Sequence, residues 1–114
     1  MKIKVLKKKR KFKVGYKKSI TLSHTADIYL KSNELVTFIS GRKKDQYDVA
    51  KKDWGYYATP SVNSRLKSFN FKTAIVKNKY KQIYIMLVNS DKMKSFKSYL
   101  KKEKSVVVSW LDTK

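Results

Sequence analysis

Cysteine is absent from this chain of 114 residues, and histidine occurs once. Without thiol groups the chain has no disulfide framework, no thiolate nucleophile and no zinc site of the usual sulfur-ligated type. A single histidine leaves one imidazole for metal binding or for proton transfer near neutral pH. The fold must therefore rest on an apolar core, which a chain of this length is able to form.

Long hydrophobic segments are also absent. The longest apolar runs are Ile83–Val88 and residues 106–108, whereas a helix needs roughly 20 apolar residues to cross a bilayer. The first residues are basic, but no apolar stretch of roughly 7 to 15 residues follows them, as a secretory signal would require. We therefore expect a cytoplasmic protein without membrane insertion.

Acidic residues are few. Eight Asp and Glu face 29 Lys and Arg, which gives a formal net charge of +21. Only three of the basic residues are arginine, a bias toward lysine that the codons of an AT-rich genome would produce. Codon bias does not remove acids, however, and a field of this strength attracts polyanions and accelerates their encounter. The charge balance therefore predicts a polyanionic partner.

The composition indicates a folded chain, since 41% of the residues are hydrophobic and 13% are aromatic, far more than a disordered polycation carries. Residues 1–18 hold ten basic residues and no acid, and Ile3, Val5 and Phe12 alternate with lysines. We interpret this segment as a basic N-terminal arm or an edge strand. Residues 19–114 are expected to form a single α+β domain.

Hydrophobic alternation in the first half predicts antiparallel strands. Residues 20–31 alternate apolar and polar side chains, as a half-buried strand does. Ser32 and Asn33 are turn formers, and residues 34–40 return as a second strand, so a hairpin is predicted here. A short third strand is expected around residues 46–50.

The second half contains two helix signals. Residues 60–69 are predicted to be helical, with Thr59 as the N-cap and Pro60 at the first helical position. A second helix is predicted to begin at Ser90 and Asp91 and to end near two lysines, which suit the negative end of its dipole.

Three further strands are predicted around these helices, over residues 71–77, 82–89 and 105–111. The second of them is apolar on both faces, as a covered central strand would be. Together the signals predict an α+β fold, with a largely antiparallel sheet of about five to six strands and two helices packed on one face.

The segment Trp54–Arg65 brings three aromatic rings and several hydroxyl or amide groups to the start of the first predicted helix. A helix start binds anions through its free N–H groups, and an arginine one turn later adds a bidentate contact. We interpret the segment as a ligand site for a phosphate or carboxylate, formed by Trp54, Tyr56, Tyr57, Thr59, Ser61, Asn63 and Arg65. In the structural alternative, Thr59 only caps the helix and Arg65 pairs with Asp48 or Asp53.

Basic and aromatic residues also lie close together elsewhere in the chain. Tyr80 lies between two lysines in a predicted hairpin loop, whereas Tyr84, Phe96 and Tyr99 are expected mostly in the core. Aromatic rings between lysines are typical of single-stranded nucleic-acid binders. The candidate nucleic-acid contacts are Lys7, Lys8, Lys9, Arg10, Lys11, Lys79, Tyr80 and Lys81.

Catalytic and metal-binding signals are weak. His24 falls on the apolar side of its predicted strand, which favours a buried, hydrogen-bonded imidazole, and Asp27 falls on the opposite face. Asp45, Asp48 and Asp53 alternate with lysines, as in a charge-balanced solvated loop. We therefore predict no catalytic residues, no metal and no cofactor, and a non-enzymatic protein is favoured.

Three functions are compatible with these patterns. The first is a non-catalytic module that binds nucleic acid, with RNA favoured over DNA because aromatic residues on a sheet suit exposed bases. The second is a small-ligand protein or accessory enzyme that recognises a phosphorylated or carboxylated metabolite at Trp54–Arg65. The third is a basic adaptor for an acidic protein partner.

Overall fold

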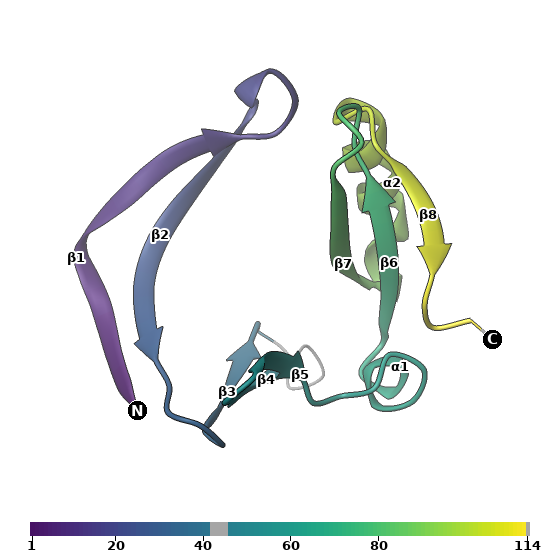
Figure 1. Cartoon of the computed structure of the whole chain (residues 1–114). Helices are drawn as coiled ribbons and strands as arrows, with labels where there is room; N and C mark the ends of the chain where they lie inside the picture. Colours follow the sequence, from purple (N-terminus) through teal and green to yellow (C-terminus); the bar gives the residue numbers. More distant parts are fainter. Residues whose placement is uncertain (42–45, 114) are drawn as a thin grey trace.

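The computed structural model describes residues 1–41 and 46–113. Their strands form three separate antiparallel sheets, in the orders β1-β2, β3-β4-β5 and β7-β6-β8 (Figure 1). The strands are β1 (Lys2–Val14), β2 (Ile20–Tyr29), β3 (Leu35–Ile39), β4 (Gln46–Lys52), β5 (Gly55–Ala58), β6 (Phe71–Lys77), β7 (Ile83–Asn89) and β8 (Val106–Trp110). The helical segments are η1 (Tyr16–Lys18), α1 (Arg65–Ser68), η2 (Ser90–Lys92) and α2 (Met93–Lys102). The α+β character is confirmed, but the single sheet with two helices on one face is wrong.

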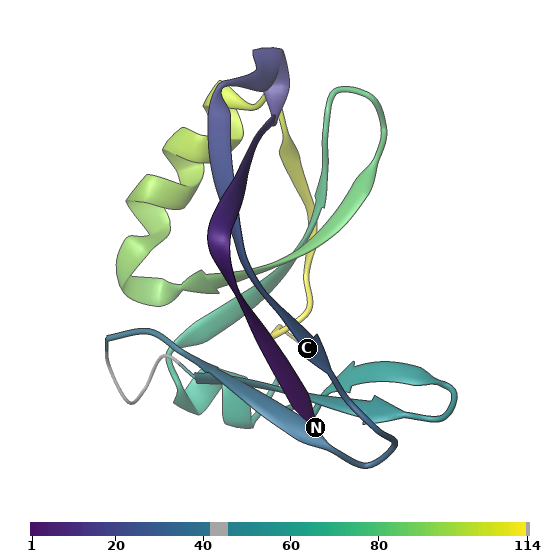
Figure 2. The ribbon, with the colours of Figure 1, turned by 90° about the vertical axis from the view of Figure 1, so that its left-hand side faces the viewer.

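The first sheet is a long, curved ribbon of two strands (Figure 2). Val14 pairs with Ile20 beside the connecting turn, and Lys2 pairs with Tyr29 at the far end. The register shifts between Val5 and Arg10. Of the two interpretations of residues 1–18, the structure therefore contains the strand.

The hairpin predicted between residues 20–31 and 34–40 is wrong, because β2 pairs with β1 and β3 pairs with β4. The backbone hydrogen bonds of the turn explain this difference. The N–H of Asn33 donates to the carbonyl of Lys51 at 2.8 Å, and the N–H of Lys51 donates to the carbonyl of Glu34 at 2.9 Å. The turn is thus bonded to the end of β4, and the chain leaves the first sheet to begin the second.

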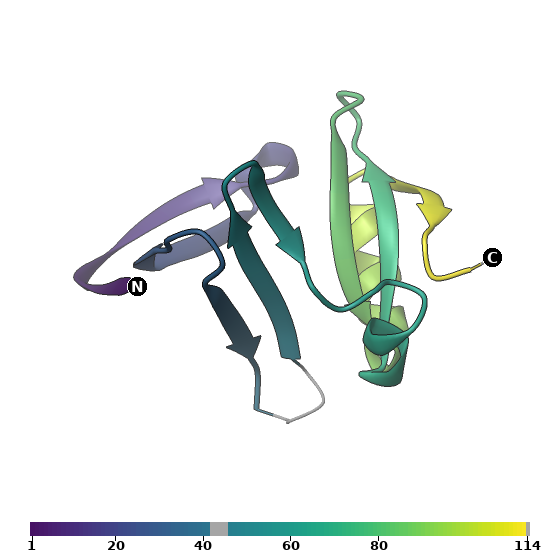
Figure 3. The same cartoon turned by 60° about the horizontal axis from the view of Figure 1, so that its bottom comes forward.

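The third sheet contains the apolar core. Helix α2 covers one face of it (Figure 3), and Leu100 of the helix packs against Ala74 and Val76 of β6. Strand β6 lies at the centre of this sheet, so the prediction that residues 82–89 form the central strand is wrong. The doubly apolar pattern was misleading because Ile83 and Ile85 are 58% and 70% exposed on the open face of an edge strand.

The first predicted helix is a single turn, and its predicted start is wrong. The N-cap is Ser64 rather than Thr59, and no side-chain hydrogen bond caps it. Ser61 supplies acceptors for the first turn instead, since its carbonyl accepts from the N–H of Leu66 at 3.0 Å and its Oγ from the N–H of Arg65 at 3.3 Å. Leu66, only 1% exposed, anchors the turn. The second predicted helix corresponds to η2 and α2.

The three sheets leave an open arrangement. The radius of gyration is 15.6 Å, against about 13 Å for an average domain of this length. The accessible surface is 8851 Å², against about 6,500 Å² for a typical monomer of this mass. Nine of the 15 aromatic side chains are among the exposed large hydrophobic residues. No helix among the described residues is both long enough and apolar enough to span a bilayer.

Candidate functional site

A cavity of about 260 Å³ lies where the turn between β1 and β2 meets the third sheet. We call it the tyrosine cleft, because its walls include Tyr16, Tyr80, Tyr84 and Tyr99. They come from η1, from the loop between β6 and β7, from β7 and from α2. Figure 1 shows that the β1–β2 turn, the β6–β7 loop and the end of α2 lie at the same end of the molecule.

Glu103 holds the two sides of the cleft together. Its Oε1 accepts a hydrogen bond of 2.6 Å from the backbone N–H of Tyr16, and its Oε2 accepts one of 3.3 Å from the Ser19 hydroxyl. The side chain is buried, with 6% of the residue exposed. Gly15 allows this close approach, because its φ is +84° and a Cβ there would lie 2.3 Å from Oε1. Residues more than 80 positions apart in the sequence are therefore joined at the cleft.

Three lysine side chains surround the ring of Tyr16. The distances from Nζ to the ring centroid are 5.6 Å for Lys17, 5.1 Å for Lys79 and 5.5 Å for Lys104. A cation at this distance is attracted by the negative face of an aromatic ring. Lysines from η1, from the β6–β7 loop and from the end of α2 thus lie near one aromatic ring, although these segments are far apart in the sequence.

Tyr80 is the most exposed ring of the cleft, at 67%. The loop that carries it is organised by Asn78, whose Oδ1 accepts from the N–H groups of Tyr80 and Gln82, each at 2.9 Å. Lys81 in this loop has a positive φ of 66°. The loop conformation is therefore fixed by its own polar groups, and the ring of Tyr80 is left free for an external contact.

Tyr84 and Tyr99 were expected mostly in the core but line the cleft with partly exposed rings. Burial raises the pKa of Tyr99, and the carboxylate of Glu103 and then Tyr84 raise it further. Tyr99 is therefore a neutral hydroxyl, able to donate a hydrogen bond, at physiological pH. Phe96 does belong to the core, where it packs edge-on against Trp110 with ring centroids 6.0 Å apart.

Only part of the predicted nucleic-acid set meets in the cleft. Lys79 and Tyr80 line it, and Lys81 follows them in the same loop. The run Lys7–Lys11 lies in β1 around its register shift, with exposed side chains, and lines no part of the cleft. Sequence reasoning missed Tyr16, although its position between Gly15 and two lysines was an available signal.

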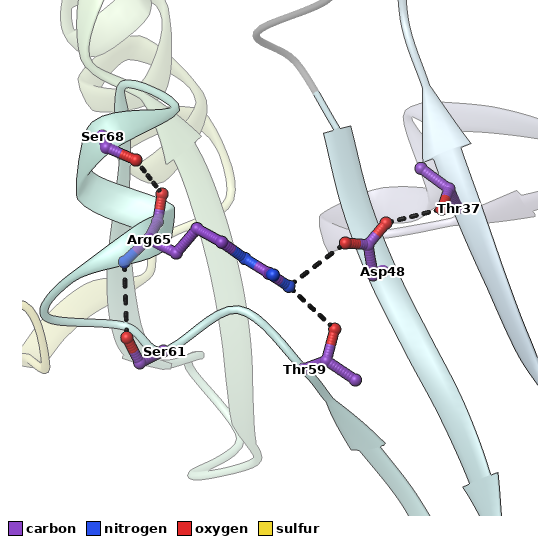
Figure 4. Close-up of polar contacts among 6 residues, drawn as sticks. All are labelled: Thr37, Asp48, Thr59, Ser61, Arg65 and Ser68. Atoms are coloured by element: carbon purple, nitrogen blue, oxygen red, sulfur yellow. Dashed lines mark hydrogen bonds and ion pairs between the residues drawn. The ribbon is translucent and has the colours of Figure 1, made fainter. Parts of the chain in front are cut away.

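The residues predicted around Arg65 form a polar network (Figure 4). Nη2 of Arg65 lies 3.2 Å from Oδ2 of Asp48 and donates to the hydroxyl of Thr59 at 3.0 Å. The other carboxylate oxygen of Asp48 accepts from the hydroxyl of Thr37 at 2.6 Å. The alternative in which Arg65 pairs with an aspartate is therefore the one present, with Asp48 as the partner. The guanidinium of Arg65 joins α1 to β4.

The other members of the predicted ligand site lie apart from this network. The rings of Trp54 and Tyr57 stack with centroids 5.9 Å apart, and Nζ of Lys51 lies 5.3 Å from the centroid of Tyr56. Asn63 lines a different cavity, together with residues near the C-terminus. The residues of Trp54–Arg65 therefore do not form one site. The aromatic residues lie on β5 and the turn before it, Arg65 and Thr59 belong to the polar network, and the amide of Asn63 lies at another cavity.

The expectations for His24 and Asp27 are wrong in two respects. Nε2 of His24 lies 2.9 Å from Oδ1 of Asp27, so the two side chains meet although a regular strand would place them on opposite faces. The register shift of the β1–β2 pair is adjacent to this position, between Ala26 and His24. The imidazole is also 37% exposed rather than buried.

Of the three aspartates considered as metal ligands, Asp45 lies outside the described residues. Asp48 is bonded to Thr37 and Arg65. Among the residues that the structure describes, no group of three or more His, Cys, Asp or Glu side chains is arranged to hold a metal ion.

The sequence matches no protein-family model, and no curated protein or solved structure matches the chain.

Proposed function

We propose that this protein is a non-catalytic module that binds single-stranded nucleic acid, with RNA preferred to DNA. The observation that carries the proposal is the tyrosine cleft, which is lined by four tyrosine rings and Lys79. The ammonium groups of Lys17 and Lys104 lie near the ring of Tyr16 in its wall. Bases stack on aromatic rings and phosphates pair with lysines, and neither contact requires a particular base sequence.

The net charge of +21 supplies the affinity in this proposal. Lysines that neutralise phosphates release condensed counterions, so the observed binding constant falls as salt concentration rises. If one face of the protein is engaged, we expect a slope that corresponds to roughly 4 to 8 released ions. The exposed aromatic residues then limit binding to strands whose bases are unpaired.

The preference for RNA follows from the kind of surface that is offered. The described helices include no pair arranged for insertion into the major groove of DNA, since α1 has only four residues. Sequence-tolerant contacts of aromatic rings with unstacked bases are instead typical of proteins that bind RNA loops and ends.

The metabolite alternative at Trp54–Arg65 has weaker support, because the guanidinium of Arg65 already bonds Asp48 and Thr59. The exposed rings of Trp54, Tyr56 and Tyr57 are the feature that favours it. An acidic protein partner would use the same net charge but has no dedicated geometry in its favour.

The test is fluorescence anisotropy with unstructured RNA, DNA of the same sequence and a duplex, across a range of salt. Tyr80→Ala should weaken binding of the single strands by about 5- to 150-fold, because stacking contributes about 1 to 3 kcal/mol per base. Tyr56→Ala is the matched control, since Tyr56 is 65% exposed and Tyr80 is 67% exposed.

Two outcomes would contradict the proposal. Binding that is absent at low salt, or that does not change with salt, would exclude the lysine field as the source of affinity. A loss of binding in Tyr56→Ala but not in Tyr80→Ala would move the site to the Trp54–Arg65 segment and favour the metabolite alternative.

A further inference from the structure

The three ammonium groups around Tyr16 form a concentrated positive charge. Each Nζ lies within 5.6 Å of the same ring centroid. The separation between any two Nζ atoms therefore cannot exceed the sum of their distances to the ring centroid. This upper limit is comparable to the Debye length of about 8 to 10 Å at physiological salt. The ammonium groups repel one another, and each is attracted by the face of the same ring.

Glu103 is the one acidic residue among the described residues that line the tyrosine cleft. Its two oxygens accept hydrogen bonds from the Tyr16 backbone and the Ser19 hydroxyl. In the part of the chain that the structure describes, no carboxylate forms an ion pair with Lys17, Lys79 or Lys104. One carboxylate at the backbone of Tyr16 and three ammonium groups near its ring leave an excess of two positive charges around this residue.

The backbone adds an independent observation. Lys17 and Lys104 have φ values of 56° and 54°, a left-handed conformation that glycine and asparagine adopt at lower cost than lysine. Unfavourable backbone conformations that persist in a fold tend to occur at functional sites. Here they occur at two of the three lysines whose ammonium groups lie near the ring of Tyr16, at positions where glycine would be accommodated at lower cost.

We propose that the Lys17, Lys79 and Lys104 cluster binds a phosphate monoester, so that the tyrosine cleft recognises the phosphorylated end of a single strand. A phosphate monoester carries about −1.5 to −2 charges near neutral pH, which matches the excess of two, whereas an internal phosphodiester carries one. Three separate lysines also suit the three terminal oxygens of a monoester, each of which accepts charge-assisted hydrogen bonds. The base next to this phosphate would stack on the tyrosines.

Recognition of a strand end rests on the proposed nucleic-acid function, whereas binding of a phosphate monoester by the three lysines does not. The test therefore compares a short RNA with a 5′ phosphate, the same RNA with a 3′ phosphate and the unphosphorylated RNA by anisotropy. Uridine monophosphate, uridine and inorganic phosphate serve as competitors. We expect one phosphorylated end to bind about tenfold more tightly than the unphosphorylated strand, and the monophosphate to compete better than the nucleoside.

The informative variant is the double replacement Lys17→Gly and Lys104→Gly, because glycine accepts both backbone conformations and the fold should persist. It should abolish the preference for the phosphorylated end. Lys81→Gly is the matched control: Lys81 also has a positive φ, of 66°, and a positive charge, but its ammonium group is not over the Tyr16 ring. This control should weaken all strands by the same factor and leave the preference intact.

The outcomes separate the two proposals. Strands that bind equally well with and without a terminal phosphate would overturn the phosphate site and leave the proposed function standing. Direct binding of inorganic phosphate and uridine monophosphate, measured by calorimetry, without binding of any strand, would support the phosphate site and overturn the nucleic-acid function. Equal loss of preference in Lys81→Gly and in the double variant would also overturn the site, since diffuse charge would then explain the effect.

Discussion

Oε1 of Glu103 lies 2.6 Å from the backbone nitrogen of Tyr16, so the residue that ends α2 holds the turn that joins β1 to β2. A hydrogen bond to a charged acceptor contributes about 1.5 to 3 kcal/mol. The contact fixes Tyr16 in the wall of the tyrosine cleft and connects the two-stranded sheet to the helical part of the molecule. The cleft therefore exists only in the folded chain.

Replacing Glu103 should destabilise the protein less when only its charge is lost than when its hydrogen-bond acceptors are lost as well. Glu103→Gln keeps an oxygen acceptor but loses the charge, and we expect a loss of about 1 kcal/mol in the free energy of unfolding. Glu103→Ala leaves the N–H of Tyr16 without its acceptor and should cost about 1 to 3 kcal/mol. Denaturant unfolding measures both values, and equal stability of the three proteins would show that the contact contributes nothing.

Gly15→Ala should destabilise the same contact from the other side. The added Cβ would lie 2.3 Å from Oε1 of Glu103, at a backbone φ of +84°. We expect a loss of about 1 to 3 kcal/mol, measured by thermal or denaturant unfolding. Gly41→Ala is the control, because nothing lies within 4 Å of a Cβ at Gly41, and its effect should stay within about 0.5 kcal/mol. Similar effects in both variants would contradict the close approach.

Lys104→Gly should raise stability. Lys104 follows the end of α2 with a φ of 54°, and the next N–H, from Ser105, donates to the carbonyl of Leu100 at 2.9 Å. This is the Schellman arrangement, in which glycine is preferred at the left-handed position. We expect a gain of about 0.5 to 1 kcal/mol in the free energy of unfolding. A loss of stability would mean that the lysine side chain supports the fold and is not reserved for binding.

Arg65→Lys should have a small effect on stability and none on nucleic-acid binding. The side chain of Arg65 is 49% exposed and bonds Asp48 and Thr59, and exposed ion pairs contribute about 0 to 1 kcal/mol. Asp48→Asn should destabilise to a similar degree, because it removes the charge from the same pair. A loss of affinity for small phosphorylated ligands in Arg65→Lys, with unchanged unfolding, would restore the anion site predicted from the sequence.

Tyr99 should make stability fall at high pH. Its pKa is raised above 10.0 in the folded protein, so the unfolded chain loses this proton first as pH rises. The unfolded state then binds fewer protons than the folded state, and the free energy of unfolding decreases above pH 10. Tyr99→Phe should remove this component, whereas Tyr56→Phe should retain it. Ultraviolet titration of tyrosinate should likewise show one fewer late-titrating tyrosine in Tyr99→Phe.

Local patterns predicted the elements better than their partners. The strands at residues 71–77 and 82–89 and the helix from Ser90 follow from alternation, helical spacing and turn residues, and all three occur. The hairpin after residue 31 fails because Asn33 and Glu34 bond to Lys51, which no local pattern reveals. The helix predicted from Pro60 fails because Ser61 supplies the acceptors for a turn that begins only at Arg65.

The candidate site was predicted in fragments for the same reason. Lys79, Tyr80 and Lys81 were recognised from a local alternation of charge and aromatic rings, and Tyr84 and Tyr99 were identified but expected in the core. Tyr16 and Glu103 could not be connected from the sequence, because the hydrogen bond between them spans 87 positions.

The sequence by itself determined the positive field, the absence of thiol chemistry and most of the secondary structure, because these depend on composition and on neighbours a few residues apart. Only the tertiary structure decided how the strands divide into three sheets, that Ile83 and Ile85 face outward, and that three lysines meet at Tyr16. Those outcomes depend on hydrogen bonds and close approaches between distant segments, as at Gly15 and Glu103, and no local sequence pattern reveals which distant segment becomes the partner.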